Sequence, residues 1–462
     1  MTATIVRKTA SRLMAPYISL AAVYALPSTA YFFDGVGNSL NPPRRRLGNA
    51  RRGVVRSGHL RRPLCSVAPL SSDGRDDNEG TLYTEADVSE TMTRESIDQM
   101  KTLADLWEKD SDDGRGGGRG RPLLLCTADE VSSYVSENFD AVLFDCDGVL
   151  YRGSDVVPGA PEAIESLISA GKTVLFVTNN AASGRSEMRN KLGGLLGPAC
   201  DNILDEGQMV GSAFSAARYL QKRLLGGKEG DGVVVVGEAT VDDTARPGRR
   251  KTVHVIGTEG LCREIRSAGF RVTGGQSSRD APPGMSRDQL ATYPFAEGGD
   301  DGVVDAVVVG LDTDFSYRKL CVANVLLQRN PAAHFVSTNE DAYDLVGADA
   351  RHLPGNGALV RALEHSSRRR AVCVGKPSAV LASLIAEDHS LDPERTLMVG
   401  DRLDTDVKFG LDGGMTSALV LTGCTTAERI AELADLRTGG TVEEPLPSVI
   451  FPHMGMMSVG SC

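Results

Sequence analysis

Short apolar runs recur from residue 141 onwards, at residues 141–144, 173–177, 371–374 and 396–400. Runs of this length, bounded by glycine or polar residues, are typical of strands buried in a parallel sheet. The positions between them are more polar and include stretches of helical periodicity. The pattern therefore predicts strands that alternate with helices.

A stripe of helical spacing lies between the first two runs and consists of Ile164, Leu167 and Ile168. Pro161 precedes it, at a position favoured in a first helical turn, and Gly171 follows it as a helix stop. Strand, helix and strand in this order predict a βαβ unit. We expect an α/β protein with a doubly wound, Rossmann-like parallel sheet.

Before the first strand, Thr127 and Glu130 form a capping-box pattern that predicts a short helix. Residues 71–121 are mostly polar, and residues 109–121 contain five glycines and no apolar residue, which predicts a flexible linker. We expect residues 73–122 to be disordered apart from one amphipathic docking helix. Its apolar positions are Ile97, Met100, Leu103 and Trp107.

The first 72 residues have the composition of a targeting segment. An apolar run at residues 13–26 follows basic residues, and an arginine-rich, acid-poor stretch comes after it. Together they resemble a two-part leader to a complex plastid, in which Tyr31 or Phe32 would follow the first cleavage site. A mitochondrial or secretory leader, a misassigned start codon or a cytoplasmic protein are the alternatives.

Charge is divided unevenly along the 462 residues. Residues 1–72 hold eleven Lys and Arg against one acid, Asp34, so they carry +10 of a net −11 and leave −21 on the rest. An acidic body argues against a nucleic-acid partner. The nine cysteines are scattered without a C-x-x-C pair, which favours a reducing compartment and argues against structural zinc.

Two strand ends carry acidic residues. Asp145 and Asp147 follow the run at 141–144 and are two positions apart, so both can lie on one side of an extended chain beside Gly148. Asp401 and Asp406 follow the run at 396–400. Each pair alone is equally compatible with a cation site, a catalytic pair or a solvated turn.

Two further strand ends carry groups suited to phosphate. Thr178 and Asn179 follow the run at 173–177, where a hydroxyl and backbone N–H groups could bind phosphate oxygens. Lys376 follows the run at 371–374 as a fixed positive charge. A helix cap and a surface lysine are the simpler interpretations of each segment by itself. Four such ends together predict phosphoryl chemistry.

In order and type, the segments FDCDGVLY, VTNN, GKP and GDRLDTD resemble the four motifs of the haloacid dehalogenase superfamily of phosphatases. The resemblance covers roughly residues 123–452 and is to the branch that holds phosphoglycolate, pyridoxal and nitrophenyl phosphatases. It implies a core at 123–256 and 365–462 that is split by a large α/β cap at 257–364. The cap of this branch implies a homodimer.

The resemblance also implies residue roles. Asp145 would be the nucleophile and Asp147 the general acid and base, while Thr178, Asn179 and Lys376 would bind phosphate. Mg²⁺ would be held by Asp145, the backbone carbonyl of Asp147 and Asp401, with Asp406 close by, acting behind these ligands or through water. Asp404 falls outside this set.

The substrate is the least constrained part of the prediction. Residues 341–344 replace the Trp-His-Pro that similar pyridoxal phosphatases carry, so 2-phosphoglycolate is expected before pyridoxal phosphate, phosphoglycerol or a phosphoprotein. A plastid address agrees with that substrate. A non-catalytic binding protein on the same fold is the alternative of another class. Residues 233–237 and 253–257 both resemble the strand that precedes the cap, with a surface insertion expected at 238–252.

Overall fold

The computed structural model describes residues 85–112, 121–226, 250–277, 286–292, 303–346, 351–437 and 444–458. They belong to one compact unit, Val67–Cys462. The leader at 1–72, the run at 233–237 and most of the insertion at 238–252 lie outside the described residues. No helix in the described part of the chain is both long and apolar enough to cross a membrane.

A seven-stranded, wholly parallel sheet forms the core. Its strands, in spatial order, are β1 (Leu123–Leu124), β16 (Val449–Phe451), β15 (Thr416–Val420), β14 (Thr396–Gly400), β2 (Ala141–Phe144), β5 (Thr173–Thr178) and β6 (Met209–Gly211). Beyond β2 the chain fills one side of the sheet through β5 and β6, and it then returns to β14 on the other side. The strand order therefore reverses between β2 and β14, as in a doubly wound sheet.

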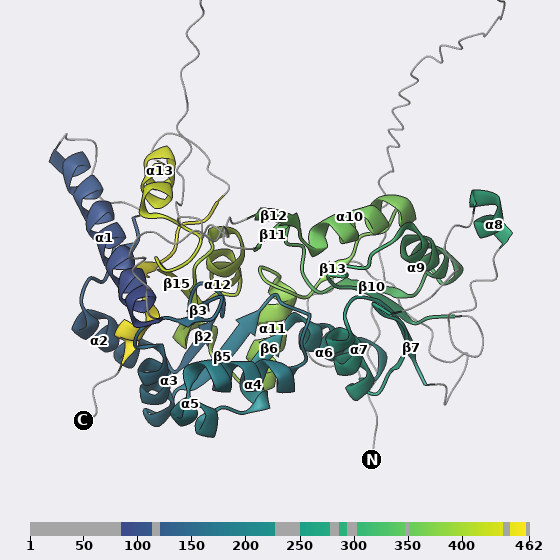
Figure 1. Ribbon diagram of the computed structural model, residues 1–462, viewed down its shortest axis with the longest axis horizontal. Helices are drawn as coiled ribbons and strands as arrows, with labels where there is room; N and C mark the ends of the chain where they lie inside the picture. The colour runs from purple at the N-terminus through teal and green to yellow at the C-terminus, as the bar shows by residue number, and fades with distance from the viewer. Residues whose placement is uncertain are drawn as a thin grey trace, which may run out of the picture. The chain divides into compact units, whose positions relative to one another are not determined.

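Helices cover both faces of the core sheet (Figure 1). The helices on one face are α2 (Ala128–Asn138), α3 (Ala160–Ser169), α4 (Arg185–Leu196) and α5 (Pro198–Ile203), with the 3₁₀ turn η6 (Met454–Met457). The helices on the other face are α1 (Glu85–Asp112), α11 (Ala379–His389), α12 (Lys408–Asp412) and α13 (Ala427–Arg437). Successive residues of β2 point to opposite faces of the sheet, as strand geometry requires. Val142 and Phe144 belong to the apolar layer on the first face, and Ala141 and Leu143 belong to the layer on the second.

A second parallel sheet has the order β13 (Val372–Cys373), β10 (His334–Ser337), β9 (Ala306–Val309), β7 (Thr252–Ile256) and β8 (Arg271–Gly274). Helices α6 (Ser212–Leu224) and α7 (Glu259–Ser267) pack on one of its faces, and α9 (Tyr317–Arg329) and α10 (Asn356–Ser367) pack on the other. This sheet is the α/β cap (Figure 1).

The remaining elements are short. Hairpins are formed by β3 (Tyr151–Arg152) with β4 (Asp155–Val156) and by β11 (Tyr343–Val346) with β12 (Arg351–Pro354). The other short helices and turns are α8 (Arg287–Thr292), η1 (Glu206–Gln208), η4 (Pro393–Arg395) and the π-helical turn η5 (Leu403–Val407).

The cap sheet extends past both expected boundaries, 257 and 364. Its strand β7 lies in the part of the chain expected to be core, and so does its edge strand β13, which pairs with β10 through Val336 and Val372. The apolar pattern of these strands fits either sheet, and their packing beside α6 decides the placement. Helix α1 likewise reaches Asp112, four residues into the expected linker at 109–121.

Candidate active site

Two neighbouring core strands deliver the acidic residues. Phe144 at the end of β2 is in register with Val399 near the end of β14, so Asp145 and Asp401 leave the sheet side by side. This is the point where the strand order reverses, which in open α/β sheets opens a crevice at the carboxyl ends of the strands. The sequence pattern had predicted both strand ends.

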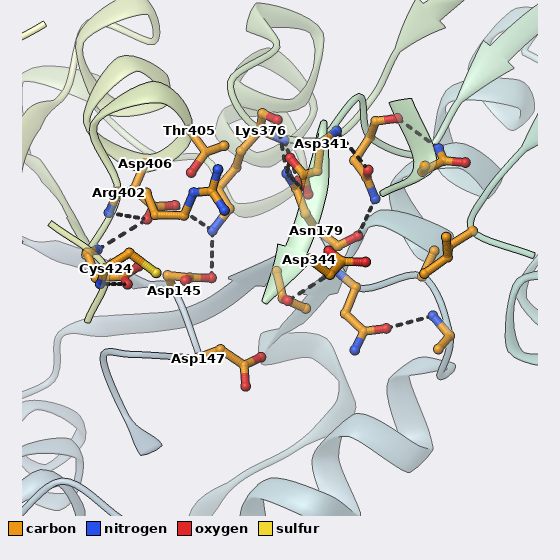
Figure 2. Close-up of a pocket in the computed structure, with 18 of the residues that line it drawn as sticks. Asp145, Asp147, Asn179, Asp341, Asp344, Lys376, Arg402, Thr405, Asp406 and Cys424 are labelled. Carbon is orange, nitrogen blue, oxygen red and sulfur yellow. Dashed lines mark hydrogen bonds and ion pairs between the residues drawn. The ribbon is translucent and has the colours of Figure 1, made fainter. Parts of the chain in front are cut away.

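Asp145, Asp401 and Asp406 form one buried cluster whose carboxylate oxygens lie within 4.8 Å of one another. The ammonium group of Lys376 lies against it. Lys376 Nζ is 2.7 Å from Asp145 Oδ1 and 2.7 Å from Asp406 Oδ1, and it donates to the carbonyl of Val177 at 2.8 Å (Figure 2). The structure thus brings together residues that are up to 261 positions apart in the chain.

The cluster holds more negative than positive charge. Burial raises the pKa of Asp145 to about 8, and the nearby carboxylates of Asp406 and Asp401 act in the same direction, while Lys376 opposes them. Burial also raises the pKa of Asp401 to about 6, with Asp406 again adding to the shift. Burial by itself would lower the pKa of Lys376, but Asp145 and Asp406 raise it above its ordinary value, so Lys376 stays an ammonium. Further positive charge close to Asp145 would lower its pKa and favour its ionised form at neutral pH.

These residues fit a divalent cation. Asp401 Oδ1 is buried and accepts no hydrogen bond from any described residue, although such an oxygen ordinarily has a partner. Its other oxygen, Oδ2, accepts from the Cys424 N–H at 2.7 Å. Asp406 lies in the same cluster, and its Oδ2 accepts from the N–H groups of Asp401 and Arg402 at 3.2 and 3.1 Å. Three convergent carboxylates are the oxygen ligands that Mg²⁺ prefers.

Asp147 has a different environment. It is exposed, lines the cavity in front of the cluster, and turns its carboxylate away from Lys376 (Figure 2). The Tyr151 hydroxyl donates to Asp147 Oδ2 at 3.4 Å, and Lys191 Nζ donates to that hydroxyl at 2.9 Å. Its side chain is therefore outside the cluster of Asp145, Asp401 and Asp406.

Thr178 and Asn179 end β5 beside the cluster. Thr178 lines the cavity, and its Oγ1 accepts from the Asn180 N–H at 3.2 Å. The Asn179 side chain is fully engaged, because its Oδ1 accepts from the Lys376 N–H at 2.7 Å and its Nδ2 donates to the Asp341 carboxylate at 3.1 and 3.2 Å. Asn179 thus ties the core sheet to the lysine segment and to the cap.

A cavity of about 500 Å³ opens in front of the cluster. Its wall includes three charged residues that sequence reasoning did not assign to the site, namely Asp341, Asp344 and Arg402. Asp341 follows β10, so the same strand-end argument could have found it. Arg402 forms an ion pair with the exposed Asp404 at 3.0 Å. Asp404 therefore pairs with Arg402 and is not part of the acidic cluster.

Comparisons with known proteins agree with this geometry. The family model for haloacid dehalogenase-like hydrolases matches residues 142–271, and a second model of HAD-like hydrolases matches residues 373–442. The chain is 38% identical to glycerol-3-phosphate phosphatase of Gallus gallus over 68% of its own length and 88% of that protein.

Two other relatives carry different names. Chronophin of Mus musculus is 39% identical over 62% of this chain and 82% of its own length. The chloroplastic phosphoglycolate phosphatase 1A of Arabidopsis thaliana is 33% identical over 64% and 72%. The solved 4-nitrophenylphosphatase of Thermotoga maritima has a TM-score of 0.51 at 25% identity and covers 70% of this chain and 98% of that one.

Proposed function

The chain belongs to the haloacid dehalogenase-like hydrolases and is a phosphoric monoester hydrolase, and from this premise we propose that it hydrolyses 2-phosphoglycolate to glycolate and phosphate with Mg²⁺. The observation that carries the proposed chemistry is the buried cluster of Asp145, Asp401 and Asp406 around Lys376. It offers a nucleophile, a cation site and a fixed positive charge within one crevice.

The proposed reaction has two steps. An oxygen of Asp145 attacks phosphorus and the bond to the substrate alkoxide breaks, with Asp147 giving its proton to that alkoxide. Water then attacks the phosphorus of the aspartyl phosphate, and Asp147 takes a proton from it while the Asp145 carboxylate is released. Asp147 faces the same cavity as Asp145, so it needs only to turn away from Tyr151.

Lys376 offsets part of the charge that accumulates when a carboxylate approaches a phosphate dianion. When bound by Asp145, Asp401, Asp406 and the carbonyl of Asp147, Mg²⁺ would supply the remaining positive charge. Thr178 Oγ1 and the backbone N–H of Asn179 are the proposed donors to the phosphate oxygens. The Asn179 side chain has the separate task of holding the Lys376 segment.

Two observations support a small acid as substrate. None of the described residues that line the cavity is aromatic, so a pyridine ring would find no stacking partner there. Arg402 offers a guanidinium group to a substrate carboxylate. The chloroplastic relative carries the corresponding activity in its name.

A second candidate is glycerol 3-phosphate. Asp341 and Asp344 stand on the cap side of the cavity, where carboxylates accept hydrogen bonds from hydroxyl groups but repel a substrate carboxylate. The relative from Gallus gallus is named for this substrate. The acidic wall and Arg402 therefore favour different leaving groups.

Steady-state rates on 2-phosphoglycolate, glycerol 3-phosphate and pyridoxal phosphate with Mg²⁺ test the proposal. We expect the highest kcat/KM for 2-phosphoglycolate, and a value no higher than that for either rival would overturn the choice. Arg402→Gln should lower kcat/KM for 2-phosphoglycolate about ten-fold or more, because a charge-assisted contact with the substrate carboxylate is lost, and should spare glycerol 3-phosphate. An equal loss on both substrates would remove Arg402 from substrate recognition.

We also propose a plastid location and a homodimer formed through the cap. The composition of residues 1–72 and the chloroplastic relatives support the first. Amino-terminal sequencing of the mature protein tests it, and an intact Met1 would contradict it. Light scattering on the purified protein tests the dimer, and a monomeric mass would contradict it.

A further inference from the structure

Helix α1 packs against the side of the core that carries the acidic cluster. Its buried face, Met100, Leu103 and Trp107, shares one apolar cluster with helix α13 and with Leu403 and Val407. The latter two begin and end the turn η5, which carries Asp406. The helix lies outside the residues that the family models match, 142–271 and 373–442.

Gln99 of α1 makes two hydrogen bonds to the backbone of the core. Its Nε2 donates to the carbonyl of Leu421 at 3.2 Å, and its Oε1 accepts from the Ala427 N–H at 3.2 Å. These two groups belong to Leu421, the first residue of the loop at 421–426 that joins β15 to α13, and to Ala427, the first residue of α13. One side chain thus brackets the loop at both ends.

The bracketed loop holds Asp401. Its Cys424 N–H donates to Asp401 Oδ2 at 2.7 Å, and the Thr425 hydroxyl donates to the Asp401 carbonyl at 2.6 Å. Gly423 lies so close to the Asp401 carboxylate that a Cβ at this position would overlap it. Any shift of the loop must therefore move Asp401 or break its hydrogen bonds.

We propose that Gln99 is a positioning residue for the cation site and that α1 is part of the working enzyme rather than an appendage. By fixing the loop at 421–426, Gln99 holds the Asp401 carboxylate in the cluster with Asp145 and Asp406, where its Oδ1 accepts no hydrogen bond from a described residue. The inference rests on the proposed cation site. Groups that orient metal ligands usually contribute ten- to a hundred-fold to metal affinity, and Gln99 acts one contact further away.

Calorimetric titration of the full chain with Mg²⁺, without substrate, tests the inference. We expect Gln99→Ala to weaken Mg²⁺ binding about three- to ten-fold. We expect the Mg²⁺ concentration for half-maximal activity to rise equally, while kcat at saturating Mg²⁺ stays within about two-fold, because Asp145, Asp147 and Lys376 are untouched. Gln99→Glu keeps the acceptor for Ala427 and should recover part of the affinity.

A matched control lies on the same helix. Among the described residues, the exposed Thr102 side chain bonds only to the carbonyl of Asp98 within α1, so Thr102→Ala should bind Mg²⁺ as the unchanged protein does. Trp107 is the single tryptophan of the chain, so its emission reports whether α1 stays docked in each variant. If Gln99→Ala undocks α1, Gln99→Glu tests the role of residue 99 in Mg²⁺ binding instead, because its side chain has nearly the volume of glutamine.

The outcomes separate this inference from the proposed function. Unchanged Mg²⁺ affinity in a docked Gln99 variant, with or without a lower melting temperature, would make Gln99 a purely structural residue and overturn the inference. A loss in kcat without a loss in affinity would do the same. An unchanged protein that binds no Mg²⁺, or an Asp401→Asn variant that binds it normally, would instead remove the proposed cation site itself.

Discussion

Asp145 is the residue on which the proposed chemistry depends most directly. Asp145→Asn removes the nucleophilic oxygen but keeps the volume and an acceptor for Lys376, so we expect phosphate release to fall at least ~1,000-fold with the fold retained. Phosphate release and thermal melting measure the two effects. Asp404→Asn, which changes an exposed acid paired with Arg402, is the control and should keep most activity. Near-normal turnover in Asp145→Asn would refute the mechanism.

His254 provides a second test at the residue scale. It is fully buried in β7 beside Thr273, and burial lowers its pKa to about 4, with a smaller contribution from Lys319. The His254 imidazole takes up a proton near pH 6.5 in the unfolded chain but only near pH 4 in the folded chain. Its contribution to the unfolding free energy is therefore fully present above pH 6.5 and is lost as the pH falls towards 4, a change of ~3 kcal/mol.

Urea unfolding at several pH values measures this effect. We expect His254→Gln to flatten the fall in unfolding free energy between pH 6.5 and 4, whatever its stability at neutral pH. His352→Gln, on the exposed strand β12, should leave the slope unchanged. The same slope in the His254 variant and the unchanged protein would show that other groups carry the acid sensitivity.

Much of the site could be predicted from single residues, because strand ends show in the sequence as an abrupt change from apolar to charged positions. Asp145, Asp401 and Lys376 were found this way. The engagement of the Asn179 side chain could not be predicted, since its partners, the Lys376 backbone and Asp341, are about 160 to 200 positions away. Arg402 was missed for a similar reason, because the cavity that it lines is completed by residues distant in the sequence, Asp341 and Asp344.

At the scale of elements, the capping box of helix α2 is a local sequence pattern that should contribute to the unfolding free energy. The capping box is confirmed, since Glu130 N–H donates to Thr127 Oγ1 at 3.3 Å and Thr127 N–H to Glu130 Oε2 at 3.0 Å. Thr127→Ala should lower the unfolding free energy by ~1 kcal/mol and shift the urea midpoint accordingly. Ser133→Ala, at an exposed position of the same helix, should change it by less than ~0.5 kcal/mol. Equal effects would show that the cap carries no stability.

The strands β7 and β13 mark the limit of element prediction. Their existence followed from apolar runs, but a run buried on both faces does not say which sheet it joins. Packing against α6 and pairing with β9 and β10 place them in the cap. Lys376 therefore reaches the acidic cluster from the edge of the cap sheet, whereas the sequence pattern placed it at a core strand.

At the scale of the whole molecule, the cluster connects both sheets. A cation that binds Asp145 and Asp401 joins β2 to β14, and Lys376 carries that connection to the cap. Because Mg²⁺ would bind the folded chain alone, a concentration of 100 times its dissociation constant should add ~2.7 kcal/mol of stability, which is several degrees in melting temperature. Chelation should reverse the gain. Asp401→Asn should show none, and an equal gain in that variant would place the ion elsewhere.

The pairing of β1 with β16 and the packing of α1 on α13 also determine how late in synthesis the fold can be completed. The ribosome makes Leu103 and Leu123 early, but their partners in α13 and β16 emerge only after more than 300 further residues. At ~5 to 20 residues per second, this delay lasts roughly 15 to 65 seconds. During it the apolar face of α1 lacks its native cover, so α1 cannot pack in its native place until α13 has been made.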